Sequence, residues 1–148
     1  MRAKVKSENY VTIMTDASFC PDTKSMGFAG WVKYGKDGET REIFGRSRTV
    51  THSFEAEVEA LERVLEFVLG NVSVQHKTVI VQSDCIGALE NIKDRWERRF
   101  KRKGARYFRT KHVKGHTTRS EPRFKLQRWL DRKAREHMQM ERDRVTGA

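Results

Sequence analysis

Two runs of β-branched residues, each closing on an aspartate, constrain the fold of this chain most. Residues 10–18, YVTIMTDAS, alternate side chains of different character and contain Asp16 near their end. Residues 78–84, TVIVQSD, repeat this form and end in Asp84. Both patterns predict strands. If the strands are parallel neighbours, both aspartates lie at the carboxyl ends of the sheet, where open α/β sheets bind ligands. Two carboxylates so close repel unless a cation lies between them.

Strands and helices are predicted to alternate around these two runs. Strands are expected at 10–18, 27–34, 40–49, 77–84 and 107–113, and helices at about 51–69, 85–100 and 122–142. Residues 19–26 are predicted as a loop. The glycine-rich segment at 35–38 is typical of a hairpin turn. We therefore predict an α/β fold with a mixed five-stranded sheet flanked by helices. Its first three strands are antiparallel, and its first, fourth and fifth are parallel.

Length and composition predict one domain. A chain of 148 residues is one domain by size, and we expect residues 1–9 and about 143–148 to be mobile. Cys20 and Cys85 form no CxxC pair, which favours a reducing compartment and a packing role for both. The start lacks the apolar core of a signal peptide, and no apolar run is long enough for a membrane helix. We expect a cytoplasmic monomer that does not enter membranes.

The helix predicted at 51–69 carries one acid on its inner side. Its apolar stripe consists of Phe54, Val58, Leu61, Val64, Leu65 and Val68. At 100° per residue, Glu57 falls about 40° from Leu61, within that stripe. Glu57 is therefore either a peripheral side chain that reaches water or an acid directed toward Asp16 and Asp84.

The limits of the helices follow from local signals. Thr51 or Ser53 is expected to cap the start of the first helix, and Gly70 to end it. Ile86 is expected on the apolar side of the next helix, with Leu89, Ile92 and Trp96.

The last predicted helix supplies a fourth acid. Asp131 lies about 100° from Leu130, at the edge of the apolar stripe, where it is either a surface ion-pair partner or a member of the acidic set. Asp16, Glu57, Asp84 and Asp131 offer hard oxygen ligands, which suit Mg²⁺ or Mn²⁺. Two such ions can clamp the attacking and leaving oxygens of a phosphodiester.

The positive charge indicates a polyanionic partner. The formal net charge is +11 and the pI about 10.0, which favours nucleic acid over a membrane surface. One basic segment has aromatic residues interleaved: Lys93, Arg95, Arg98, Arg99, Lys101, Arg102, Lys103 and Arg106 surround Trp96, Phe100 and Tyr107. The segment is interpreted either as a track for a sugar-phosphate backbone or as a solvated face.

Five short motifs in order resemble ribonuclease H of type 1. They are TDAS in the first strand, AEVEAL in the first long helix, QSD at the end of the fourth strand, VKGH after the fifth, and WLDRKARE in the last helix. The resemblance covers residues 10–138. It implies cleavage of the RNA strand of RNA–DNA hybrids with Mg²⁺, two ions per site with Mn²⁺ as a substitute, and products with 5′-phosphate and 3′-hydroxyl ends.

The resemblance also implies residue roles. Asp16 would be shared by both metals, Glu57 and Asp84 would help hold the leaving-group metal, and Asp131 would help hold the metal that activates water. His116 would assist proton transfer or product release. Hybrid contacts would come from the backbone near Ala17, Ser18, Cys20 and Ser53, and from Lys93, Arg98, Arg99, Lys101, Arg102, Lys103 and Lys114.

The stretch between His116 and Asp131 departs from the family. It is longer than usual, and Gln127 stands about where the family has an asparagine. Two other functions remain open: a DNA-directed nuclease of the same fold, and a non-catalytic basic domain that binds nucleic acid.

Overall fold

Five strands form one mixed sheet within residues 9–114 and 121–147, which the computed structural model describes. They are β1 (Tyr10–Cys20), β2 (Ser25–Tyr34), β3 (Glu39–Ser47), β4 (Thr78–Ser83) and β5 (Tyr107–His112). Their order across the sheet is β3-β2-β1-β4-β5. β1, β2 and β3 are antiparallel, whereas β1, β4 and β5 are parallel. The predicted fold class is confirmed.

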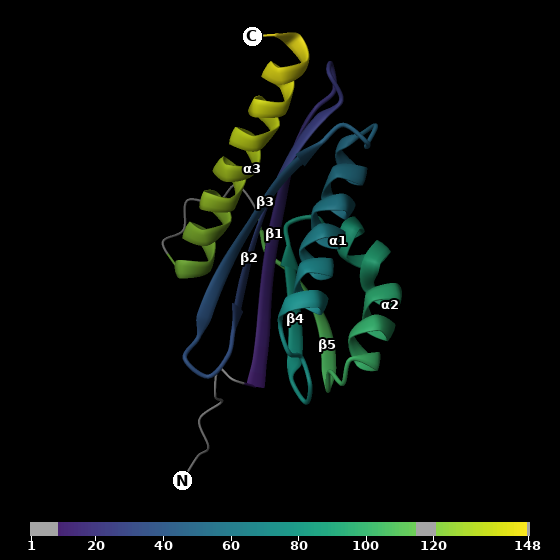
Figure 1. The fold of residues 1–148 in the computed structure, drawn as a ribbon, viewed down its shortest axis with the longest axis vertical. Helices are drawn as coiled ribbons and strands as arrows, with labels where there is room; N and C mark the ends of the chain where they lie inside the picture. The colour runs from purple at the N-terminus through teal and green to yellow at the C-terminus, as the bar shows by residue number, and fades with distance from the viewer. Residues whose placement is uncertain (1–8, 115–120, 148) are drawn as a thin grey trace.

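Helices cover both faces of this sheet. α1 (Ser53–Asn71) and α2 (Ile86–Arg102) lie on one face, and α3 (Pro122–Thr146) lies on the other (Figure 1). Successive strand residues point to opposite faces, so Val11 and Ile13 join the core under α1 while Met14 joins the core under α3. None of the described helices is both long and apolar enough to cross a membrane.

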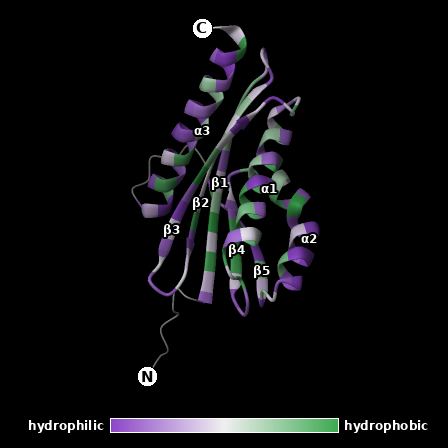
Figure 2. Cartoon of the chain, viewed as in Figure 1, coloured by the Kyte–Doolittle hydropathy of each residue, from purple (hydrophilic) through white to green (hydrophobic). Residues whose placement is uncertain are grey.

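The larger core lies between the sheet and the α1–α2 layer. Hydrophobic residues form bands along the central strands (Figure 2). Its fully buried side chains include Val11, Ile13, Leu61, Leu65, Ile92 and Phe100. Each such side chain contributes about 1.5–3 kcal/mol on burial. This core therefore fixes where β1 and β4 end relative to α1.

The contact between α3 and β2 is a close one. Gly27 lies on β2, and a Cβ atom there would collide with the backbone of α3 at Ala134 and Met138. Leu130 and Ala134 are fully buried in this second core. The close packing sets the position of the helix that carries Asp131.

The predicted loop at residues 19–26 is half strand and half turn. Phe19 pairs with Met26 and Cys20 with Ser25, so the hairpin narrows to a turn at residues 21–24. Pro21 lies in this turn, outside the ladder, where its missing N–H costs nothing. The prediction was wrong because the pairing of β1 with β2 overrides the polar composition of these residues.

The N-terminus of α1 is capped differently from the prediction. Neither Thr51 nor Ser53 is the N-cap. His52 occupies that position, and its Nδ1 atom accepts from the N–H of Glu55 at 3.5 Å. Ser53 is the first residue of the helix and is exposed.

All three helices run past their predicted ends, and α2 reaches Arg102 instead of residue 100. α1 continues through Gly70, and the N–H of Val72 donates to the carbonyl of Val68 at 2.9 Å. A side chain at position 70 would meet open space, so nothing in the packing requires the helix to stop there. α3 reaches Thr146, through part of the terminus that the sequence predicted to be mobile.

Two residues assigned to inner stripes are exposed instead. Phe54 is 40% exposed and Ile86 53% exposed. Each lies in the first turn of its helix, at the end of the helical layer, where periodicity does not ensure a neighbour. Phe54 lies against Gly87, where a Cβ atom would be 3.2 Å from the Phe54 ring.

Candidate functional site

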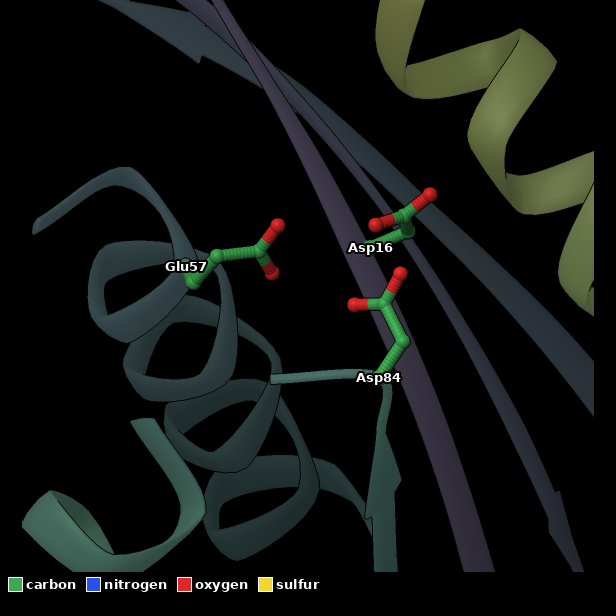
Figure 3. Close-up of side chains that lie close together, drawn as sticks. All are labelled: Asp16, Glu57 and Asp84. Atoms are coloured by element: carbon green, nitrogen blue, oxygen red, sulfur yellow. The ribbon is translucent and has the colours of Figure 1, made fainter. Parts of the chain in front are cut away.

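Three acidic side chains converge at the carboxyl ends of β1 and β4. Asp16 projects from β1, Asp84 follows Ser83 at the end of β4, and Glu57 reaches toward them from α1 (Figure 3). One oxygen atom from each residue lies within 4.8 Å of the others. The structure thus brings together three of the four acids that the sequence singles out.

Local hydrogen bonds hold the backbone that carries these acids. The N–H of Ala17 donates to Oδ1 of Asp16 at 3.0 Å. The backbone N–H of Cys85 donates to Oγ of Ser83 at 3.1 Å, and Nε2 of His112 lies 3.1 Å from the carbonyl oxygen of Asp84. These contacts hold one oxygen of Asp16 and the backbone around Asp84 in place.

Burial and mutual repulsion raise the pKa values of two of the acids. Asp16 is only 2% exposed, and burial, followed by the charges of Asp84 and Asp131, raises its pKa from 3.8 to about 8. Burial, followed by the charges of Asp16 and Asp84, raises the pKa of Glu57 from 4.5 to about 9. A raised pKa means that the cluster favours added positive charge at these carboxyl groups. A metal cation bound there would be stabilised in place of the protons.

The acidic cluster fits a hard divalent cation. The Oε2 atom of Glu57 is buried and has no hydrogen-bond partner among the described residues. A buried carboxylate oxygen without a partner is costly, and a bound cation would remove that cost. The cluster offers carboxylate oxygens alone, which Mg²⁺ and Mn²⁺ prefer.

Asp131 lies beside this cluster rather than within it. It contributes to the raised pKa of Asp16 both by its charge and by a side-chain hydrogen bond. Its Oδ2 atom also accepts from Arg135 at 3.0 Å, one turn along α3, and its side chain is 30% exposed. Both interpretations of Asp131 thus apply, since it forms a surface ion pair and also contacts the acidic centre.

A small cavity of about 30 Å³ joins α3 to the acids, and Gln127 and Arg128 line it together with Asp16, Asp84 and Asp131. Gln127 is 3% exposed, and neither polar atom of its amide has a partner among the described residues. Gln127 precedes Asp131 by four residues, so helical periodicity places both on one side of α3. That spacing was the available sequence signal for a role of Gln127 beside the acids.

The remaining predicted site residues are dispersed. Ala17, Ser18 and Cys20 lie on β1 beyond its pairing with β4. Lys114 follows β5 and is exposed, as is Ser53 at the start of α1. His116 lies outside the described residues.

The basic segment on α2 differs from its sequence interpretation. Of its three interleaved aromatics, Trp96 and Phe100 are buried in the core, as expected for Trp96 from the apolar stripe, whereas Tyr107 lies on β5 and is exposed. Arg95 pairs with Glu62 of α1 at 2.9 Å, and Arg99 with Glu66 at 2.7 Å. Exposed cations remain at Lys93, Arg98, Lys101, Arg102 and Lys103. Lys101 also lies 3.6 Å from Glu97. The segment can present charge to a polyanion but no stacking surface.

Comparison with known proteins supports the fold. The sequence matches no known protein family and no curated protein. Among solved structures, it is similar to the N-terminal RNase H domain of Rv2228c from Mycobacterium tuberculosis, solved as a fusion with maltose-binding protein. The TM-score is 0.57 at 14% sequence identity, over 94% of this chain and 99% of that chain. The chain has an RNase H-like fold, and its acidic cluster could hold a metal ion.

Proposed function

We propose that this chain is a metal-dependent endoribonuclease that cleaves the RNA strand of RNA–DNA hybrids. One observation carries the proposal: Asp16, Glu57 and Asp84 converge at the strand ends of an RNase H-like fold. These residues, with Asp131 beside them, would hold Mg²⁺ or Mn²⁺. Such ions, when bound, lower the pKa of water and stabilise charge on phosphoryl oxygens.

The chain's own residues position the reacting groups. Oδ1 of Asp16 accepts from the N–H of Ala17, which orients this carboxyl group within the cluster. Gln127 has two unpartnered amide atoms beside the acids and could orient a water or a phosphate oxygen. We propose that His116 assists proton transfer or product release. The products would carry 5′-phosphate and 3′-hydroxyl ends.

Substrate recognition would rest on shape rather than sequence. A-form geometry and the 2′-hydroxyl distinguish an RNA strand from DNA. Backbone groups near Ala17 and Ser53 are candidates for these contacts. The exposed cations of α2 would contact phosphates. Arg99 would contribute less, because Glu66 already neutralises it.

One cleavage experiment tests the proposal. A single end-labelled sequence is presented as RNA–DNA hybrid, as double-stranded DNA and as single-stranded RNA, with Mg²⁺, with Mn²⁺ and with EDTA. The proposal expects cutting of the RNA strand of the hybrid alone, only with metal, and none by the Asp16→Asn variant. Cutting of double-stranded DNA would favour a DNA-directed nuclease. Binding without cutting under all conditions would favour a non-catalytic domain.

A further inference from the structure

The sheet face under α3 is only partly covered. α3 begins beside the middle of the sheet and runs toward the β1–β2 hairpin, so no described helix lies over the part nearest the start of β1 (Figure 1). Strand pairing identifies the side chains there, because directly paired residues point to the same face. Trp31, Met14, Gln82 and Lys111 form one row across four strands at the border of the covered part, where Met14 is buried under α3 and Trp31 packs against the same core. Lys33 and Arg109 lie in the next row, and Tyr107 in the one after.

This open sheet face, defined by Trp31, Lys33, Gln82, Tyr107, Arg109 and Lys111, is basic and aromatic. Lys33, Arg109 and Lys111 are exposed. Tyr107 is 46% exposed, with the guanidinium of Arg109 5.3 Å from its ring centre. The face therefore combines one exposed ring, that of Tyr107, and one half-buried ring, that of Trp31, with three exposed cations.

A hollow of about 470 Å³ lies where the open sheet face meets the start of α3. Met14 and Gln82 form its floor and are 1% and 8% exposed. Trp31 and Lys33 line one side, and Arg123 of α3 lines the other. Its volume is within the range of small-ligand pockets. The hollow can therefore accept a planar ring, with cationic groups beside it for an attached anion.

We propose that the open sheet face binds single-stranded nucleic acid. Bases would stack on Trp31 and Tyr107, and phosphates would contact Lys33, Arg109 and Lys111. Stacking of successive bases on aromatic side chains beside cations is how sequence-tolerant single-strand binding works, and sheet-borne aromatics serve this purpose in RNA-binding domains. The charge of the face argues for a polyanion over a protein partner, because its paired rows contain three cations, Lys33, Arg109 and Lys111, and one acid, Glu42.

The open sheet face lies close to the acidic centre. Met14 and Asp16 are two residues apart on β1 and point to the same face, which separates them by roughly 7 Å. A strand held on the open sheet face would therefore lie close to the acidic centre. This would favour hybrids that continue into a single-stranded overhang.

The test measures single-strand binding without any cleavage. Fluorescein-labelled oligouridylate and oligothymidylate, each of about 12 nucleotides, are titrated with the full chain in EDTA, and anisotropy gives the Kd. Tyr107→Ala should weaken binding at least about fivefold. Trp31→Ala should do the same, with Trp31→Phe largely restoring affinity because the ring is kept. Melting curves identify any variant that fails to fold, and Tyr107→Ala, at an exposed position, keeps the test valid.

A matched pair of charge variants distinguishes single-strand binding by this face from binding by any exposed positive charge. Arg109→Gln and Arg102→Gln each remove one exposed arginine, the first from the open sheet face and the second from α2. The proposal expects Arg109→Gln to weaken single-strand binding several-fold more than Arg102→Gln. Equal effects, or full affinity in Tyr107→Ala, would overturn it. Because single-strand binding is measured in EDTA and without cleavage, failure of this proposal does not imply failure of the proposed nuclease activity, and the reverse also holds.

Discussion

Two glutamates on α1 occupy opposite electrostatic environments. Glu66 is exposed and accepts two hydrogen bonds from Arg99 of α2, at 2.7 and 3.2 Å, which lower its pKa. Glu57, about two and a half turns earlier, faces Asp16 and Asp84 and has its pKa raised to about 9. On the same helix, Glu66 is thus paired with a cation, whereas Glu57, nearer the start of the helix, faces two other acids.

The difference shows that the acidic centre does not follow from a shortage of cations. The chain has 31 lysine and arginine residues. Arginines of α2 neutralise Glu62 and Glu66, yet the Oε2 atom of Glu57 meets no described partner. A cluster that costs stability amid an excess of positive charge is best explained by a cation from outside the chain.

The largest expected effect comes from neutralising Glu57, the glutamate of α1 that faces the acidic cluster. Mutation of a residue that supports a metal ligand typically costs ~10–100-fold in activity. Glu57→Gln removes a proposed ligand itself and should reduce hybrid cleavage by more than that. Glu66→Gln removes the same charge from the same helix and should leave cleavage within about twofold of the unmodified chain. Steady-state rates with Mg²⁺ compare the two. Equal losses would mean that Glu57 acts only through the overall charge or stability.

The second prediction concerns the pH dependence of stability without metal. Asp16 and Glu57 have raised pKa values in the folded chain and ordinary values in the unfolded chain. Between about pH 4 and 9 the folded state therefore binds more protons, so the free energy of unfolding falls as pH rises. Each group contributes at most ~1.4 kcal/mol per pH unit.

Melting temperatures in EDTA from pH 5 to pH 8.5 check this prediction. The decline should be shallower in Glu57→Gln, and millimolar Mg²⁺ should restore stability mainly at the alkaline end, because bound metal displaces protons. Glu66→Gln is the control and should keep the full decline. A melting temperature that rises over this range in EDTA would contradict the raised pKa values.

Sequence patterns predicted the acidic centre because several independent signals agreed there. Asp16 and Asp84 each close a β-branched run, and parallel pairing brings such ends together. Helical periodicity placed Glu57 among apolar neighbours, and the structure directs it to the same place. Each of these signals is local, and the sheet order then assembles them.

Other features depended on tertiary contacts that no local pattern contains. Helical periodicity placed Trp96 on the apolar side of α2, and both Trp96 and Phe100 are buried there, whereas the basic run around them gave no sign of which rings are covered. Tyr107 belongs to the same run yet lies on a strand and is exposed. Phe54 fits the apolar stripe but lies at the end of the layer. Periodicity gives the direction of a side chain and leaves open what covers it.

A smaller effect is expected from the cations of α2 that take no part in the pairing with α1. Replacing Lys93, Arg98, Arg102 and Lys103 with alanine should weaken hybrid binding and reduce its dependence on salt. The slope of the logarithm of the binding constant against the logarithm of the salt concentration should fall in magnitude by about 0.7–0.9 for each phosphate that is no longer neutralised. Binding titrations at several salt concentrations measure the slope. An unchanged slope would mean that this side of α2 is only a solvated face.

The smallest expected effect concerns Glu66, the glutamate that is paired with Arg99. Glu66→Gln should lower the free energy of unfolding by no more than ~1 kcal/mol, because the pair with Arg99 is exposed and screened by water. Urea unfolding at pH 7 measures the change. A loss of several kcal/mol would show that the packing of α1 against α2 depends on this pair.

Direct measurement of metal binding tests the central claim, that the acids on β1, β4 and α1 form a divalent-cation site. Titration with Mn²⁺, followed by electron paramagnetic resonance, gives the number of bound ions and their affinity at pH 8. We expect saturable binding that is lost or strongly weakened in Asp16→Asn and in Glu57→Gln but unchanged in Glu66→Gln. Equal Mn²⁺ binding by all four proteins, or none by the unmodified chain, would contradict the account.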